Sequence, residues 1–243
     1  MRTLLYIIIL FTTIACNKDV AKKDDLSVTD LYHSAASNMK SGNLKQSLEL
    51  FEKAEQEYPY SPWATRAKIM QIYCHYLLSD YESVTINADA FLKLHPAHQD
   101  ADYVLYMKAL SYYDRIPKIT KDQEYAKNAL ELFEKLISTY SISEYAKDSR
   151  IKMDLIKDHL AGKEMDIGRY YLRQKNYIAA LNRFQNVIKF YQTTSHTQES
   201  LYRMVEIFAS LGISDEATKY ATVLGANYPE STWYDHSISK IKF

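Results

Sequence analysis

The sequence is poor in glycine and proline, the residues on which most tight turns depend. Its 243 residues include five glycines and five prolines, against averages of roughly 7% and 5% of a chain. Strand-to-strand connections need such turns, so their scarcity argues against a β-sandwich or barrel. The glycines stand apart, and no stretch reads G-x-G-x-x-G or G-x-x-x-x-G-K-[ST]. A Gly-rich phosphate-binding loop is therefore absent, and an all-α fold is predicted.

The chain also has no excess of charge of either sign, because 30 Lys and Arg residues balance 30 Asp and Glu residues. A general nucleic-acid-binding protein needs surplus basic side chains to neutralise phosphates. Nucleic acid is therefore not an expected partner.

Metal-binding and catalytic motifs are scarce as well. Two cysteines cannot form a four-thiolate zinc site. His95 and His98 have ligand-like spacing, but Pro96 breaks the helix between them at an expected polar turn. The H-E-x-x-H and G-x-S-x-G patterns are absent, and adjacent acids such as Asp24 and Asp25 are typical of solvated charge. We predict no metal, no cofactor and no enzymatic activity.

The N-terminus has the pattern of a signal peptide. Residues 4–14 are almost wholly apolar and follow one positive charge, Arg2. This run is too short to span a membrane, which needs about 20 helical residues. The string Thr13-Ile14-Ala15-Cys16 resembles the processing box of bacterial lipoproteins, in which the cysteine is acylated. We predict a lipoprotein signal peptide over residues 1–15 and lipid attachment at Cys16; an ordinary secretory signal is the alternative.

Residues 16–29 are predicted to form the acylated cysteine and a flexible tether, because they are rich in Lys and Asp with little to bury. By resemblance to bacterial lipoproteins, Asn17 points to the outer membrane, where Asp would favour the inner one. Several acyl chains on one cysteine anchor a protein firmly. Cys74 would then have no disulfide partner within the chain and is expected to pack in a helix as a small apolar residue.

An internal repeat occupies residues 30–243. Counting back from Pro59, Ala54, Phe51 and Ser47 lie five, eight and twelve positions away, on one face of a helix. This is the tetratricopeptide pattern, and the same frame recurs before Pro96, Ser141, Gln192 and Pro229. We predict a tetratricopeptide-repeat solenoid of about five helix pairs, with units at roughly 28–61, 62–98, 99–143, 144–194 and 195–231.

Three details follow from this frame. Pro59, Pro96 and Pro229 are expected to end helices, and Gly168 to mark a close approach of two helices. Residues 114–122 are expected to form a loop and residues 145–175 one unusually long helix. The 22 tyrosines suit a binding surface, because the ring packs while the hydroxyl stays hydrated.

Four strings carry a family resemblance: Tyr58-Pro-Tyr-Ser-Pro-Trp-Ala64, Leu94-His-Pro-Ala-His98, Asp102-Tyr-Val-Leu-Tyr-Met-Lys-Ala-Leu110 and Asn182-Arg183. Together with the lipoprotein box and five units, they resemble the BamD family over residues 16–230. These are lipoproteins of the outer-membrane β-barrel assembly machinery. The resemblance implies a non-catalytic scaffold, lipid-anchored at the periplasmic face of the outer membrane, that helps to assemble and insert barrel proteins.

The resemblance implies two interfaces. The N-terminal units would hold unfolded outer-membrane proteins in a groove. The candidate groove residues are Tyr32, Tyr60, Trp63, Tyr73 and Tyr76. For each of them, packing in the core between helices is the alternative role. The C-terminal units would dock on a periplasmic domain of the barrel insertase, a BamA-like protein, through Asn182 and Arg183. A guanidinium grips a carboxylate with two hydrogen bonds, although Arg183 could also be a solvated surface residue. Accessory lipoproteins are further implied partners.

Two other functions fit parts of the sequence. A periplasmic tetratricopeptide adaptor that coordinates cell-envelope synthesis or division would share the solenoid without needing the lipid or the string over residues 102–110. A muramidase-like hydrolase built on a helical solenoid would need a catalytic Glu in a Gly- or Ser-lined cleft. No such Glu stands out in the sequence.

Overall fold

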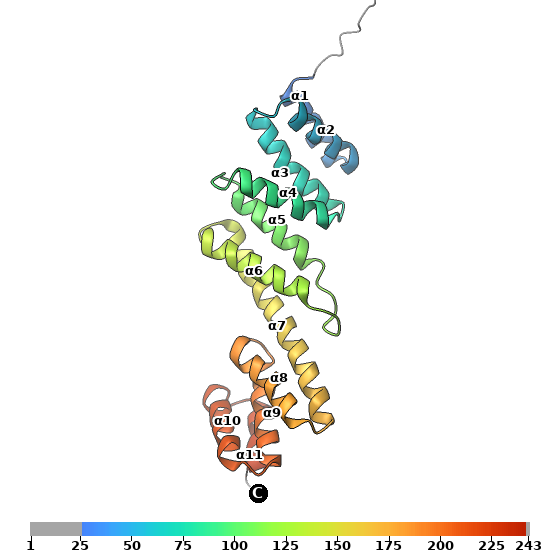
Figure 1. Ribbon diagram of the computed structural model, residues 1–243. Coiled ribbons are helices and arrows are strands. Elements are labelled where there is room, and N and C mark those ends of the chain that lie inside the picture. The colour runs from blue at the N-terminus through green and yellow to red at the C-terminus, as the bar shows by residue number, and fades with distance from the viewer. Residues whose placement is uncertain (1–25, 242–243) are drawn as a thin grey trace, which may run out of the picture.

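The computed structural model describes residues 26–241, and this part of the chain folds into eleven α-helices without a strand (Figure 1). The predicted all-α fold is confirmed. The signal peptide, Cys16 and most of the predicted tether lie outside the described residues. In chain order the helices are α1 (Val28–Lys40), α2 (Leu44–Glu57), α3 (Pro62–Leu77), α4 (Tyr81–Leu94), α5 (Ala101–Tyr113), α6 (Glu124–Thr139), α7 (Glu144–Arg173), α8 (Tyr177–Phe190), α9 (Thr197–Ser210), α10 (Ser214–Asn227) and α11 (Thr232–Ile241).

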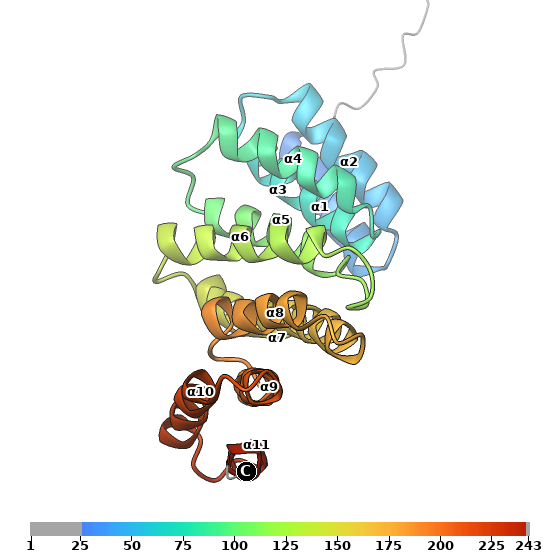
Figure 2. The same cartoon turned by 60° about the horizontal axis from the view of Figure 1, so that its bottom comes forward.

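The helices pair as antiparallel hairpins that stack into an elongated solenoid, as both cartoon views show (Figures 1 and 2). The pairs are α1–α2, α3–α4, α5–α6, α7–α8 and α9–α10, and each second helix also packs on the first helix of the next pair. An eleventh helix, which the repeat frame did not predict, packs on α9 and α10. Helix α11 therefore covers apolar surface that a further unit would otherwise cover.

Helix ends follow from local sequence. Pro59, Pro96 and Pro229 each come directly after the C-cap residue of α2, α4 and α10, so the predicted helix stops are confirmed. The turn inside the first hairpin instead uses Gly42, whose φ of 81° is costly for residues with a Cβ. The predicted loop and the predicted long helix are also present. Residues 114–123 connect α5 to α6 without a helix, and α7 runs over 30 residues.

The repeat frame forms the core. The residues five and eight positions before each terminator are at most 3% exposed: Phe51 and Ala54, Ala88 and Phe91, Phe133 and Leu136, Phe184 and Val187, Ala221 and Leu224. At Gly168, a Cβ would lie 2.6 Å from Cε1 of Phe184, which confirms the predicted close approach of α7 and α8.

Helix α7 joins two parts of the core. Ile156 and Leu160 belong to the cluster built by α3 to α6, whereas Ala161 and Met165 belong to the cluster built with α8 and α9. Cys74 is fully buried on α3, with its sulfur 3.6 Å from Ser47 Oγ, so the prediction that it packs in a helix is confirmed. Among residues 26–241, none of the helices combines the length and the apolar character that crossing a membrane requires.

Candidate functional site

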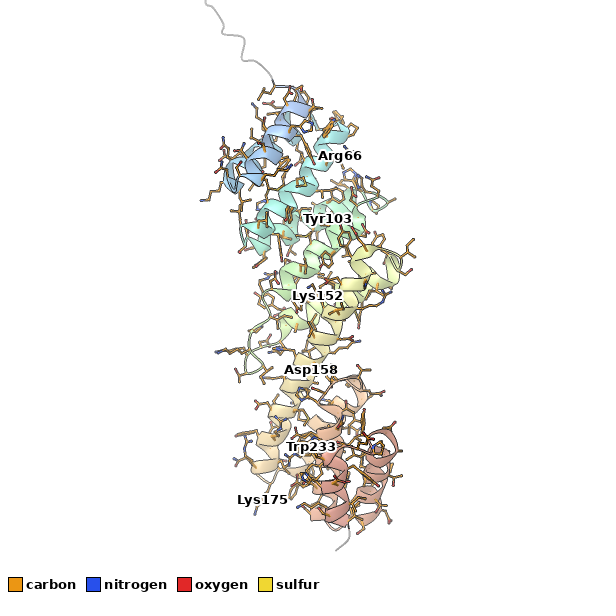
Figure 3. The ribbon with its side chains drawn as sticks, turned by 180° about the vertical axis from the view of Figure 1, so that it is seen from behind. Arg66, Tyr103, Lys152, Asp158, Lys175 and Trp233 are labelled. Carbon is orange, nitrogen blue, oxygen red and sulfur yellow. The ribbon has the colours of Figure 1, made fainter. Side chains whose placement is uncertain are left out.

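The first helices of successive units, α1, α3, α5 and α7, contact one another in turn and form one face of the solenoid, here called the A face. Aromatic rings bridge these helices. The ring of Tyr32 on α1 lies 4.9 Å from that of Trp63 on α3, and the ring of Tyr103 on α5 lies 5.3 Å from that of Tyr145 on α7. The guanidinium of Arg66 lies 5.1 Å from the Trp63 ring centroid. Figure 3 shows Arg66, Tyr103 and Lys152 in succession along these helices.

Two tyrosine hydroxyl groups on the A face donate hydrogen bonds to carboxylates. Tyr76 Oη donates a hydrogen bond of 2.6 Å to Asp114 Oδ2, and Tyr106 Oη donates one to Asp148. Burial raises the pKa of both tyrosines, and these hydrogen bonds raise it further. The two hydroxyls therefore stay protonated and hold the neighbouring helices and the loop after α5 in register.

Four of the five predicted groove residues lie on A-face helices. Tyr32 and Trp63 touch, and Tyr73 and Tyr76 follow on α3, where both pack against the core cluster of α3 to α6. Tyr60 does not join them. It occupies the turn between α2 and α3 with its side chain fully exposed, because the chain reverses there before Ser61 caps α3.

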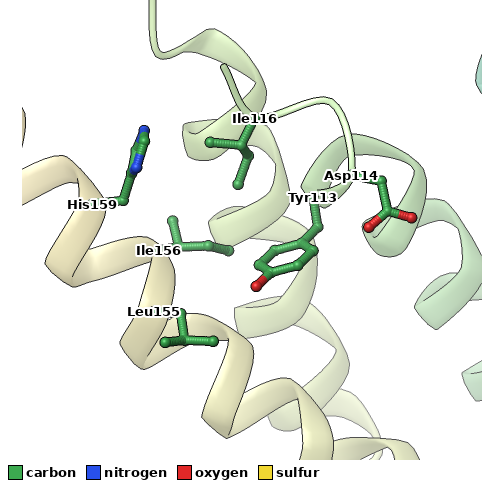
Figure 4. A pocket seen from close by; sticks show the side chains of 6 residues that line it. All are labelled: Tyr113, Asp114, Ile116, Leu155, Ile156 and His159. Carbon is green, nitrogen blue, oxygen red and sulfur yellow. The ribbon is translucent and has the colours of Figure 1, made fainter. Parts of the chain in front are cut away.

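A cavity of about 330 Å³ lies next to this series, between the end of α5 and the middle of α7 (Figure 4). Tyr113, Ile116, Leu155 and Ile156 give it apolar walls, and Asp114 and His159 also line it. His159 Nε2 is buried there without a hydrogen-bond partner within residues 26–241. Burial lowers the pKa of His159, so the ring is neutral at pH 7. Because the ring is neutral and the walls are largely apolar, an apolar side chain could enter the cavity without desolvating a cation.

The first helices of the C-terminal half carry an ion network in addition to a ring contact between Tyr202 on α9 and Trp233 on α11. Arg169 on α7 donates two hydrogen bonds to Glu199 on α9, of 3.0 and 2.6 Å, and Arg203 bonds both Glu199 and Glu206. Burial raises the pKa of Glu199, but the two guanidinium groups lower it more, and the net pKa is below its ordinary value. Charge on this surface is thus neutralised within the chain.

Arg183, the predicted docking residue, lies on α8 and is paired inside the chain. Its Nη1 is 3.2 Å from Glu164 Oε1, and Asn186 donates a bond of 2.9 Å to the same carboxylate. The Arg183 side chain remains 38% exposed beside a cavity of about 400 Å³, which Lys127 and Lys163 also line. Asn182, the other predicted docking residue, is exposed.

Sequence reasoning missed Tyr103, Tyr106 and Tyr145 on the A face, and the network around Glu199. A signal existed for two of them. Tyr103 and Tyr106 are three positions apart in the string over residues 102–110, a spacing that places them on the same side of a helix. The ion network has no such signal in the sequence, because Arg169 and Glu199 are 30 residues apart and lie on different helices.

Stacked helix hairpins with buried small and aromatic frame residues define this molecule as a tetratricopeptide-repeat protein. Residues 24–224 match the family model described as YfiO, outer membrane lipoprotein. Proteins named outer membrane protein assembly factor BamD are similar along most of their length. The one from Rickettsia prowazekii is 42% identical over 215 residues, which cover 88% of this chain and 86% of the relative.

The Caulobacter vibrioides relative of the same name is 39% identical over 204 residues, covering 84% of this chain and 67% of its own. The Neisseria meningitidis serogroup A relative is 30% identical over 231 residues, covering 91% and 86%. The chain therefore belongs to the BamD family, which the sequence resemblance predicted.

Proposed function

We propose that this protein is an outer-membrane protein assembly factor, a non-catalytic scaffold anchored by lipid on Cys16 at the periplasmic face of the outer membrane. Family membership and the names of its relatives support this role. The observation that carries the proposal is the presence of aromatic contacts between first helices, one between α1 and α3 (Tyr32 with Trp63) and one between α5 and α7 (Tyr103 with Tyr145). Such a surface suits the capture of other polypeptide chains.

The clients in this proposal are unfolded barrel proteins. Their extended strands expose apolar side chains and unpaired backbone groups at once. Half-buried aromatic rings offer large apolar area at little cost in conformational entropy. The guanidinium of Arg66 forms no ion pair within residues 26–241, so it is available to a client carbonyl or carboxylate. The cavity beside Ile156 would hold one apolar client side chain.

The partner in this proposal is a BamA-like insertase, which would dock near Arg183. Glu164 pairs with the guanidinium and Asn186 holds that carboxylate, so less side-chain entropy is lost when a partner carboxylate binds the exposed side of Arg183. Lys127 and Lys163 nearby would add favourable charge for an acidic partner surface. Accessory lipoproteins are further proposed partners.

Purification of the acylated full chain from detergent-solubilised envelopes tests the function as a whole. We expect an outer-membrane insertase to co-purify. Recovery of cell-wall enzymes alone would contradict the proposal and favour the envelope-synthesis adaptor. Processing at Cys16 is checked in the same cells, because globomycin should block maturation if this residue is the lipoprotein site.

Arg183→Glu tests the docking surface. We expect at least a fivefold drop in co-purified insertase with unchanged helical content, because the variant reverses the charge offered to the partner. Arg173→Glu is the matched control, since it makes the same charge change at an exposed position near the end of α7. Equal recovery with both variants would remove Arg183 from the interface.

A further inference from the structure

The turns that connect one unit to the next lie together on one edge of the solenoid, because successive helices run in opposite directions. We call residues 58–61, 95–100, 140–143, 191–196 and 228–231 the joining edge. Figure 1 shows the turns after α4 and α6 on the same side, opposite the turns after α3 and α7. The joining edge is distinct from the A face, which the first helices form.

Three of these turns have the same construction, and two of them have an apolar tip, whereas the third, at residues 228–231, has Glu230 there. Ser61 N–H donates to the Tyr58 carbonyl at 2.9 Å, and Ser143 N–H donates to the Tyr140 carbonyl at 3.0 Å. Each serine then caps the next helix through its side chain. The residue before each serine, Tyr60 or Ile142, projects from the turn with its side chain 100% exposed. Neither tip contributes burial to the fold.

The joining edge is also nearly free of formal charge. Its five turns contain no Lys or Arg, and their carboxylates are those of Asp100 and Glu230. The turns on the opposite edge, residues 41–43, 78–80, 114–123, 174–176 and 211–213, hold four cations: Arg115, Lys118, Lys121 and Lys175. Contact with a lipid interface therefore requires less desolvation of charge along the joining edge than along the opposite one.

The chain enters the solenoid at this edge. Tyr58 Oη donates a hydrogen bond of 2.9 Å to the carbonyl of Leu26, which fixes the first described residue beside the turn that carries Tyr60. Leu26 itself is 42% exposed. The ten peptide steps from Cys16 to Leu26 span at most about 35 Å. A lipid on Cys16 would therefore keep the Tyr60 turn close to the membrane surface.

We propose that the joining edge rests on the phospholipid surface, with Tyr60 and Ile142 entering the headgroup region. The inference depends on the proposed acylation of Cys16. Tyrosine favours this region because its ring is apolar and its hydroxyl stays hydrated. Each of these two side chains contributes little membrane-binding free energy alone. The lipid on Cys16 already holds the chain at the membrane, so the contact is intramolecular and weak insertion is enough to orient the solenoid. The A face then stays open to clients.

Site-specific labelling of the acylated full chain tests this orientation. Cys74 is fully buried and Cys16 would carry lipid, so Tyr60→Cys and Ile142→Cys each provide one accessible thiol for an environment-sensitive fluorophore. Ile213→Cys is the matched control, because Ile213 is an exposed apolar residue in a turn of the opposite edge. The proteins are reconstituted into vesicles of phosphatidylethanolamine and phosphatidylglycerol that contain a nitroxide-labelled lipid.

We expect at least threefold stronger quenching at positions 60 and 142 than at position 213. Quenching at position 60 alone, or equal quenching at all three positions, would overturn the proposal. A third outcome would also overturn it: labels at positions 60 and 142 that are shielded in native envelopes but not quenched in vesicles that contain no other protein. In that case a protein partner, and not lipid, would cover the joining edge. Failed acylation is detected separately, because the protein then does not float with the vesicles in a density gradient. The assay contains neither client nor insertase, so its result does not depend on the assembly function.

Discussion

The two halves of the A face share one helix frame but differ in chemistry. In the N-terminal half, half-buried rings meet between α1 and α3 and between α5 and α7, and Arg66 lies against the Trp63 ring with no carboxylate partner within residues 26–241. From the second half of α7 onto the next first helix, α9, Arg169 and Arg203 pair with Glu199 and Glu206, so that two cations balance two carboxylates. The frame constrains only buried positions, so the exposed side of each first helix is free to differ.

The two tryptophans show this difference at equivalent positions. Trp63 and Trp233 each follow a serine by two residues, and each backbone N–H donates to that serine's hydroxyl. Each ring also has a guanidinium near it, 5.1 Å from Trp63 and 5.7 Å from Trp233. The guanidinium beside Trp233 belongs to Arg203 and is already paired. The N-terminal half therefore differs in that the guanidinium beside its tryptophan has no carboxylate partner within residues 26–241.

Glu199→Ala is the largest expected perturbation of this comparison. It leaves Arg169 and Arg203 without their shared carboxylate, whose side chain is 13% exposed, and should cost about 2–3 kcal/mol. Hydrogen exchange should report lost protection in α7 to α9, with α1 to α4 unchanged. Glu216→Ala is the control, because its pair with Lys219 is exposed and such pairs contribute about 0.5 kcal/mol. Uniform loss along the chain would mean that the halves unfold together.

Trp63→Ala tests whether client binding belongs to the N-terminal half. Removing this ring takes away its contacts with Tyr32 and Arg66. Affinity for a fluorescent peptide from an unfolded barrel client should fall about tenfold, equivalent to about 1.4 kcal/mol. Trp233→Ala should leave that affinity within about twofold. Equal losses would contradict the division between the halves.

Mild acid should give the smallest effect, and it should act mainly on the C-terminal half. The pKa of Glu199 in the folded protein lies below its ordinary value of 4.5. As pH falls below that value, the unfolded chain gains the proton first, so the contribution of Glu199 to stability is lost. Hydrogen exchange at decreasing pH should show α9 losing protection before α3. Glu199→Gln should remove this difference, and a response that persists in the variant would assign it to other carboxylates.

Much of the architecture was predictable because it depends on short-range geometry. Frame residues at fixed offsets from Pro59, Pro96 and Pro229 were predicted to share a helix face, and they are buried. The length of α7 and the packing role of Gly168 followed from the same periodicity. These features need only the helical repeat and the residues that stop it.

The sequence by itself thus determined the five helix pairs, the helix ends at Pro59, Pro96 and Pro229 and the buried frame, but not α11, since spacing along one helix fixes which residues share a face. Tertiary structure decided what the remaining side chains contact. Tyr32 and Trp63 meet because α1 and α3 stack, whereas Tyr60 projects from the joining edge. Glu199 finds Arg169 across 30 residues for the same reason. Such contacts depend on how units rotate against one another, which local spacing does not specify.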